Sequence, residues 1–298
     1  MASATQLVPG VSLITTPGPG LALHTADGEF LRVDTARTGR ERLLDALSGR
    51  PADAESDTET EAAPASAPDG QLAALIAAFR EAGYAEPVRD EGPARPGRLA
   101  GRTVFLLGDP ALTTPLHRLV RAEGGAARSI EPADIGRLNR GPRRADPVAV
   151  VWCLDHPVPN GLWDEADLLP GRHTAWLRCH REGAQVWLEP LADRPGDVTS
   201  AHVRLRRLAA TPAHRELSAY WDGQRTPDTG TLGTDASAAL IAALLVGDLL
   251  AWAADAPGSG PLPVRRRLRR LDLRDLRVTE HPVLPVPEVA PLPTRSGR

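Results

Sequence analysis

Lysine is absent from this sequence, cysteine is nearly absent, and aromatic residues make up only 4% of it. All 35 basic residues are arginine, a bias that we attribute to a GC-rich genome and not to function. The two cysteines, Cys153 and Cys179, are 26 residues apart and do not form a paired-cysteine metal motif. Both lie in apolar, strand-like runs, so we expect them to be small buried core residues.

Long apolar runs and a strong charge of either sign are also missing. No stretch has the roughly 18 uninterrupted apolar residues that a membrane span needs. The N-terminus shows no basic segment followed by an apolar one, as a signal peptide would. The net charge of −3 and the pI of about 6.3 give no electrostatic case for nucleic acid. We therefore expect a cytoplasmic protein that binds neither membrane nor nucleic acid.

Residues 99–120 predict a strand, a turn and a helix, but they lack the glycines of a dinucleotide-binding turn. Residues 104–107 form a continuous apolar run, typical of a strand buried on both faces. A dinucleotide-binding turn here needs three glycines, so that the backbone can approach a pyrophosphate. This chain has only Gly108, followed by Asp109, which adds negative charge, and Pro110, which lacks an N–H donor. The pattern predicts a degenerate nucleotide loop on a retained scaffold.

The first 84 residues predict a small recognition module of three strands and two helices, similar to a winged helix. The strands fall at residues 11–15, 21–25 and 30–33, with a hairpin signal at Asp27-Gly28. Leucines from Leu43 to Leu47 mark the first helix. Residues 50–69 are acidic and proline-bearing, and we interpret them as a disordered linker inside the module.

From residue 99 to residue 298 the pattern is that of a second domain of α/β type, after a linker at 85–98. A weak strand begins near Ala127, and residues 147–154 and a hairpin around Gly183 supply buried strands. Residues 200–221 predict one polar helix and residues 236–254 a strongly apolar one. Residues 265–278 alternate arginine with leucine, which predicts a strand with one solvated face. The proline-rich tail, 282–298, is expected to be extended.

Signals for catalysis are weak throughout. No GxSxG or HExxH motif occurs, and the eight histidines show no metal-ligand spacing. Among them, we expect structural roles for His156, His173, His180 and His281. Asp109 and Asp155 follow two buried strands, where α/β active sites lie, but no nucleophile, base or phosphate clamp accompanies them. We therefore predict no catalytic residue and no metal ligand.

The strongest positive signal is the third strand of the N-terminal module. A free edge strand beside a helix can receive an extended peptide, with backbone hydrogen bonds for affinity and apolar pockets for specificity. The predicted edge is Phe30, Leu31, Arg32 and Val33, and the predicted opposite wall is Leu72, Leu75, Ile76 and Phe79. An ordinary winged helix packed on the second domain fits the pattern equally well.

The order of these parts resembles a known family, the ThiF-like leader-peptide-binding partners of YcaO cyclodehydratases in azoline and thiopeptide biosynthesis. The likeness lies in residues 99–109, in the run 186–191 (Val-Trp-Leu-Glu-Pro-Leu), in the apolar helix at 238–254, and in Leu271-Asp-Leu followed by the run 281–285. It implies an N-terminal RiPP recognition element and a degenerate adenylating-enzyme-like α/β domain, with a leader peptide and a YcaO enzyme as partners and a homodimer as a possible state.

The departures from that family concern its cofactors. Many relatives hold a structural zinc with two Cys-x-x-Cys pairs, but the corresponding segments, 193–200 and 285–289, carry no cysteine. With the nucleotide loop also degraded, we expect neither zinc nor ATP. The resemblance therefore implies a non-catalytic subunit that delivers a ribosomal precursor peptide to the cyclodehydratase. Two alternatives stay open, namely an active adenylating enzyme with a divergent loop and a winged-helix transcriptional regulator.

Overall fold

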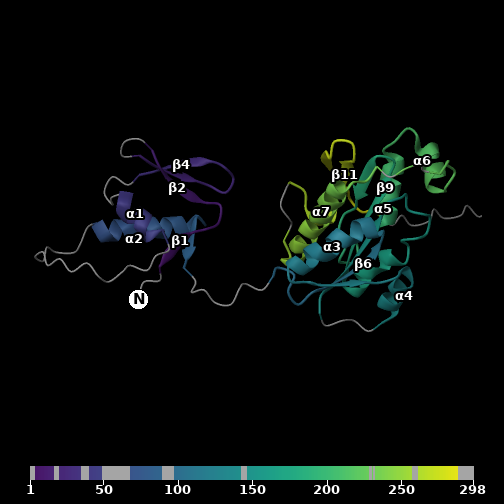
Figure 1. Cartoon of the computed structure of the whole chain (residues 1–298), viewed down its shortest axis with the longest axis horizontal. Coiled ribbons are helices and arrows are strands. Elements are labelled where there is room, and N and C mark those ends of the chain that lie inside the picture. The colour runs from purple at the N-terminus through teal and green to yellow at the C-terminus, as the bar shows by residue number, and fades with distance from the viewer. Residues whose placement is uncertain are drawn as a thin grey trace, which may run out of the picture. The chain divides into compact units, whose positions relative to one another are not determined.

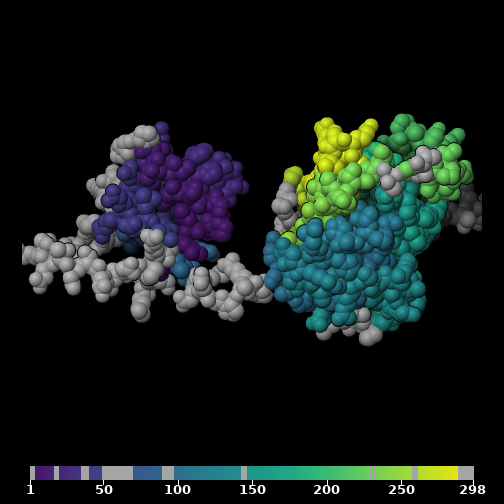
Figure 2. Space-filling view, viewed as in Figure 1, coloured from purple at the N-terminus to yellow at the C-terminus, as the bar shows by residue number. Residues whose placement is uncertain are grey.

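The computed structural model describes residues 4–16, 20–34, 40–48, 68–88, 97–141, 146–227, 230, 232–256 and 261–287. The chain divides into two compact units, Met1–Arg95 and Pro96–Arg298. Each unit has a hydrophobic core of its own. Figure 1 draws the elements of the two units as ribbons, and Figure 2 draws their atoms. We describe them separately.

The first unit combines a three-stranded antiparallel sheet, a two-stranded ribbon and two helices. Leu21 and Leu23 of the central strand pack with Leu43, Leu47 and Phe79 of the helical segments to form its core. Gly28, at φ +84°, closes the hairpin between the second and third strands of the sheet. In chain order the elements are β1 (Thr5–Leu7), β2 (Ser12–Thr15), β3 (Leu21–His24), β4 (Phe30–Val33), α1 (Arg40–Ala46), α2 (Pro68–Glu81) and β5 (Ala85–Pro87).

Two segments, 85–98 and 50–69, were predicted to be linkers. The predicted linker 85–98 is wrong at its start, because Ala85–Pro87 form strand β5, which pairs antiparallel with β1. This ribbon holds the two ends of the unit together, and its three-residue strands are too short to show a sequence period. Residues 50–67 of the predicted acidic linker lie outside the described residues. Its last two residues, 68 and 69, are the first two residues of α2.

The second unit is built on a seven-stranded mixed sheet in the order β12-β11-β10-β9-β8-β6-β7. The strands β7, β6, β8 and β9 run parallel, and β9 to β12 are antiparallel neighbours. The strands are β6 (Thr103–Gly108), β7 (Ala126–Ser129), β8 (Val148–Leu154), β9 (Thr174–Glu182), β10 (Gln185–Leu188), β11 (Arg267–Asp272) and β12 (Val278–Pro282).

Helices cover both faces of this sheet (Figure 1). On one face α3 and α7 pack against the aliphatic side chains of the strands. On the other face α4 and η1 pack around a cluster that contains three mutually edge-on tryptophans, Trp152, Trp163 and Trp176. The helices are α3 (Pro110–Ala122), α4 (Pro132–Arg140), η1 (Ala166–Arg172), α5 (Ser200–Ala209), α6 (His214–Trp221), α7 (Asp235–Ala253) and η2 (Val264–Arg266).

The prediction of a single helix at 200–221 is wrong, and the prediction of a helix at 236–254 is confirmed. The first is two helices, α5 and α6, because Pro212 cannot continue a helix and the chain turns there. The second is α7, the one helix in the described residues that is long and apolar enough to cross a membrane by length and composition alone. However, 56% of that window is buried inside the unit, where Ile241, Leu245 and Leu249 belong to the main core.

The predicted solvated face of the arginine-rich strand is wrong. Arg267 and Arg269 of β11 are only 4% and 6% exposed. Their guanidinium groups donate to the carboxylate of Asp248, a buried residue of α7, at 2.6 and 2.7 Å. Glu280 of β12 accepts a further hydrogen bond from Arg269. The strand therefore carries a buried ion-pair cluster beneath α7, and Arg270 points to the other face and is exposed.

Candidate functional site

The first candidate site is the edge of the sheet where the parallel strands β6 and β8 end, the usual ligand position in open α/β sheets. Gly108 ends β6 with φ +110°. A Cβ atom at this position would lie 1.8 Å from the carbonyl oxygen of Cys153 on β8. No other residue fits here, so Gly108 is required by the contact between two strands and not by a phosphate.

Asp109 and Asp155 are held by contacts within this edge. A carboxylate oxygen of Asp109 accepts a hydrogen bond from the backbone N–H of Asp155 at 2.6 Å. The carboxylate of Asp155 in turn accepts from the buried guanidinium of Arg181 at 2.7 Å, and Arg181 also donates to the carbonyl of Gly183. The two carboxylates therefore cross-link the ends of strands and do not form an acid–base pair.

At this edge the turn carries a negative charge and lacks one backbone donor. The turn presents the Asp109 carboxylate and the ring of Pro110, which is the first residue of α3 and has no N–H to donate. A pocket of about 200 Å³ lies beside the turn, lined by Asp155, Arg181 and the first turn of α7. Two charged groups of that pocket, Asp155 and Arg181, pair with each other.

The segments in which the resemblance implies zinc-binding cysteines lie close together. Val198, from the first segment, and Val283, just before the second, belong to one apolar cluster with Val203 and Leu268. Arg206 of α5 donates to the carbonyls of Leu284 and Pro285. Apolar packing joins the segments here, and the Arg206 side chain fastens the second of them to α5. The described residues contain no group of three or more His, Cys, Asp or Glu that could hold a metal.

Of the histidines and cysteines named from the sequence, His180 and both cysteines are buried, whereas His156, His173 and His281 are exposed. Cys153 and Cys179 are register partners on β8 and β9, fully buried as free thiols. Their mutual hydrogen bond and their burial raise the pKa of the Cys153 thiol well above its usual range. His173 ends η1 in a left-handed conformation, and His281 contacts Thr279 on β12. The predicted burial of the two cysteines is confirmed, and the structural roles of the histidines stay a prediction.

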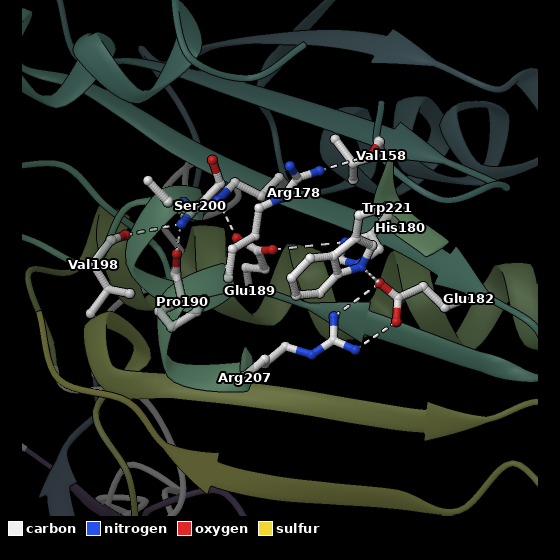
Figure 3. A network of polar contacts seen from close by, with 12 residues as sticks. Val158, Arg178, His180, Glu182, Glu189, Pro190, Val198, Ser200, Arg207 and Trp221 are labelled. Carbon is white, nitrogen blue, oxygen red and sulfur yellow. Dashed lines mark hydrogen bonds and ion pairs between the residues drawn. The ribbon is translucent and has the colours of Figure 1, made fainter. Parts of the chain in front are cut away.

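A buried polar network on the other face of the sheet is the feature that sequence reasoning missed (Figure 3). Arg178 of β9 is completely buried and donates to Glu189 at 2.8 Å and to the carbonyls of Pro190 and Val198. These contacts hold the loop after β10 against the sheet. Because Glu189 is buried, its pKa is raised despite the charge of Arg178.

The same network continues to the helical pair α5–α6 through Glu182. Its carboxylate accepts hydrogen bonds from Arg207 of α5, Trp221 of α6 and His180 of β9, at 2.6 to 3.1 Å. Burial alone would raise the pKa of Glu182, but the hydrogen bonds from His180 and Arg207 outweigh burial and lower it. This network fastens the helices to the sheet.

The second candidate site is the edge strand β4 of the first unit. Within the described residues, β4 pairs only with β3, in the register Leu21–Val33, Leu23–Leu31 and His24–Phe30. Phe30 is 67% exposed and Leu31 38%, which is unusual for apolar residues on a strand. Phe30 stacks on His24, with ring centroids 4.8 Å apart.

The hydrogen-bonding phase of β4 follows from its hairpin. The N–H of Thr25 donates to the carbonyl of Glu29 at 2.9 Å, so these two form a hydrogen-bonded pair. Because such pairs alternate in an antiparallel ladder, Leu31 and Val33 bond to β3. The backbone N–H and C=O groups of Phe30 and Arg32 therefore point to the open edge.

The predicted opposite wall is only partly available. Leu72, Leu75 and Ile76 of α2 are half-buried against the core of the first unit, to which Val33 also belongs. Phe79 is 6% exposed and is a core residue, so it cannot line a groove. Its assignment as a peptide-binding residue is corrected on this ground.

Comparison with known proteins shows the fold. Neither a protein-family model nor a curated sequence matches. Among solved structures, the heterocyclase TruD is similar with a TM-score of 0.62 and 15% identity, over 95% of this chain and 42% of its own. E. coli MccB has a TM-score of 0.58 and 10% identity, over 95% of each chain. A heterocyclase in complex with substrate and cofactor has a TM-score of 0.58 and 13% identity, over 95% of this chain and 39% of its own.

These likenesses confirm the predicted class, a small module of strands and helices followed by a ThiF-like α/β domain. The chain spans less than half the length of the heterocyclases that it resembles. At 10–15% identity the comparison establishes the shared fold.

Proposed function

We propose that this chain is a recognition and scaffold subunit that binds the leader segment of a ribosomal precursor peptide and presents it to a YcaO-type cyclodehydratase. The observation that carries the proposal is the open edge of β4, with two exposed apolar side chains and outward-facing backbone groups. The heterocyclases that share the fold support the choice of pathway.

Strand addition at β4 supplies both affinity and selectivity. A peptide that pairs with Phe30 and Arg32 extends the antiparallel sheet by one strand. Its alternate side chains then lie beside Leu31 and Val33, on the face that carries the helices and the core. We expect a leader with apolar residues at every second position of the bound segment.

The degraded nucleotide turn supports a non-catalytic role. In the turn at Gly108, Asp109 and Pro110, the carboxylate of Asp109 accepts the N–H of Asp155, and Pro110 has no N–H to donate to a phosphate. On this proposal the chain contributes effective concentration, because a tethered leader keeps the reactive core of the precursor near the partner enzyme. The partner supplies the ATP-dependent chemistry.

The proposal is tested by fluorescence polarisation with the full chain and a labelled leader peptide, taken from a precursor gene that neighbours this one. The Arg32→Pro variant removes one outward N–H, a change that an edge strand tolerates. We expect it to weaken binding about tenfold or more, the value of one to two backbone hydrogen bonds. The matched control, Arg32→Ala, keeps the N–H and removes only the side chain, so it should bind nearly as well as the wild type.

Two results would contradict the proposal. One is the absence of binding by every neighbouring precursor. The other is a leader that binds Arg32→Pro as tightly as it binds Arg32→Ala, which would place the peptide away from β4. Thermal unfolding of both variants checks that the first unit is intact.

A further inference from the structure

A stacked pair of rings lies on the outer face of the three-stranded sheet, next to its open edge. Side chains alternate along a strand, so Leu21 and Leu23 of β3 enter the core, whereas His24 faces outward. Phe30 of β4 stands directly opposite His24 in the register, and the two ring centroids are 4.8 Å apart. The pair therefore lies on the face of the sheet that points away from the core.

The ring of Phe30 is uncovered on the side of the open edge. Phe30 is 67% exposed, more than any other large apolar side chain in the described residues. His24, on β3, contacts the ring from one side, and within the described part of the chain no strand lies beyond β4 on the other. Aromatic rings bury a large apolar area and attract each other in stacked or edge-on pairs. A strand added at this edge can therefore cover the ring with an aromatic side chain of its own.

The hydrogen-bonding phase of β4 fixes which residue of an added strand meets Phe30. The outward N–H and C=O of Phe30 bond to the residue directly opposite, and the two side chains then share the outer face. Such opposite side chains have Cβ atoms about 4.5–5.5 Å apart, within reach of a ring contact. In an antiparallel strand, the residue just before this one and the residue two further back point to the inner face, beside Leu31 and Val33.

We propose that His24 and Phe30 form an aromatic platform, which selects leader peptides with an aromatic residue opposite Phe30. This inference rests on the proposed function, because it specifies which leader β4 binds. For an antiparallel leader the platform and the inner face together require the order apolar, any residue, apolar, aromatic, with the aromatic residue last. A parallel leader has the reverse order, so the position of the aromatic residue also reports the direction of the added strand.

The test is a double-mutant cycle, measured by fluorescence polarisation with the full chain and the labelled leader peptide of a neighbouring precursor gene. Phe30→Ala should weaken binding about three- to tenfold, the value of one aromatic pair. It should have no further effect on a leader whose aromatic residue is replaced by alanine, because stacking needs both rings. The control is Leu168→Ala, which shortens a 63% exposed apolar side chain of the second unit and should leave binding unchanged.

Phe30→Leu separates ring stacking from apolar contact and from folding. It keeps an apolar side chain at the edge, so the sheet stays intact, but it removes the ring and should lose most of the affinity that Phe30→Ala loses. The platform is overturned, and strand addition is kept, if Arg32→Pro weakens binding while Phe30→Ala and Phe30→Leu do not. A leader that binds at β4 with no aromatic residue in its bound segment also overturns the platform. A chain that binds no neighbouring leader overturns the proposed function together with it.

Discussion

Replacing Gly108 by alanine tests whether the turn after β6 is a structural requirement. The added Cβ would lie 1.8 Å from the Cys153 carbonyl oxygen, whereas real Cβ contacts stay beyond 3.0 Å. The ends of β6 and β8 must therefore move apart. That movement breaks the hydrogen bond from the Asp109 N–H to the Cys153 carbonyl and the bond that the Asp109 carboxylate accepts from Asp155.

The free energy of unfolding that Gly108→Ala loses has two parts. An alanine with positive φ loses about 1–2 kcal/mol. The two broken hydrogen bonds add about 1 kcal/mol each, and more where a buried group is left without a partner. We expect Gly108→Ala to lower the free energy of unfolding of the second unit by about 3–5 kcal/mol. Gly101→Ala is the matched control, because Gly101 has φ +74° with nothing within 4 Å of a Cβ, so only the first part applies.

Urea unfolding followed by tryptophan fluorescence measures this cost in the second unit alone. All six tryptophans lie between Trp152 and Trp252, so the first unit contributes no signal. The reasoning is refuted if Gly108→Ala and Gly101→Ala lose the same free energy of unfolding. Equal losses would mean that the strand ends separate freely, and that the turn could also open for a phosphate.

Three further predictions concern the same unit. Arg178→Met leaves the buried Glu189 carboxyl without its cation and should cost about 3–5 kcal/mol, and most of this should return when Glu189→Leu is added. Because the pKa of Glu182 lies below its usual 4.5 in the folded state, its contribution to stability is complete above pH 4.5 and is lost as the pH falls toward the folded-state value. Thermal midpoints measured from neutral to acid pH should therefore fall less steeply for Glu182→Gln. Magnesium ATP should leave the thermal midpoint unchanged and support no pyrophosphate exchange, and a rise in the midpoint would favour the adenylating alternative.

The central strands of the second unit could be predicted because the local sequence of each strand indicates it without knowledge of distant residues. Residues 104–107 and 148–154 are short continuous apolar runs, which are typical of a strand buried on both faces. The hairpins at Gly28 and Gly183 were equally clear, since both glycines have positive φ in the structure. Local backbone requirements of this kind appear directly in the sequence.

The buried charges could not be placed in the same way, because each depends on a partner distant in the chain. The alternation of arginine and leucine in β11 correctly predicted a strand, but the arginine face was assigned to solvent. The signal that could have corrected this is Asp248, the one charged residue inside the apolar helix α7. A carboxylate at such a position needs a cation, and Arg267 and Arg269 provide it.

The phase of β4 shows what the structure adds to a correctly predicted site. The sequence locates the edge strand and gives its two faces, because side chains alternate along any strand. It does not say which backbone groups are free, since that depends on which pair closes the hairpin. The Thr25–Glu29 pair fixes the phase, so a proline at Leu31 or Val33 would break the pairing with β3 and unfold the sheet. Only Phe30 and Arg32 can lose an N–H without that loss, and for this reason Arg32→Pro separates peptide binding from folding.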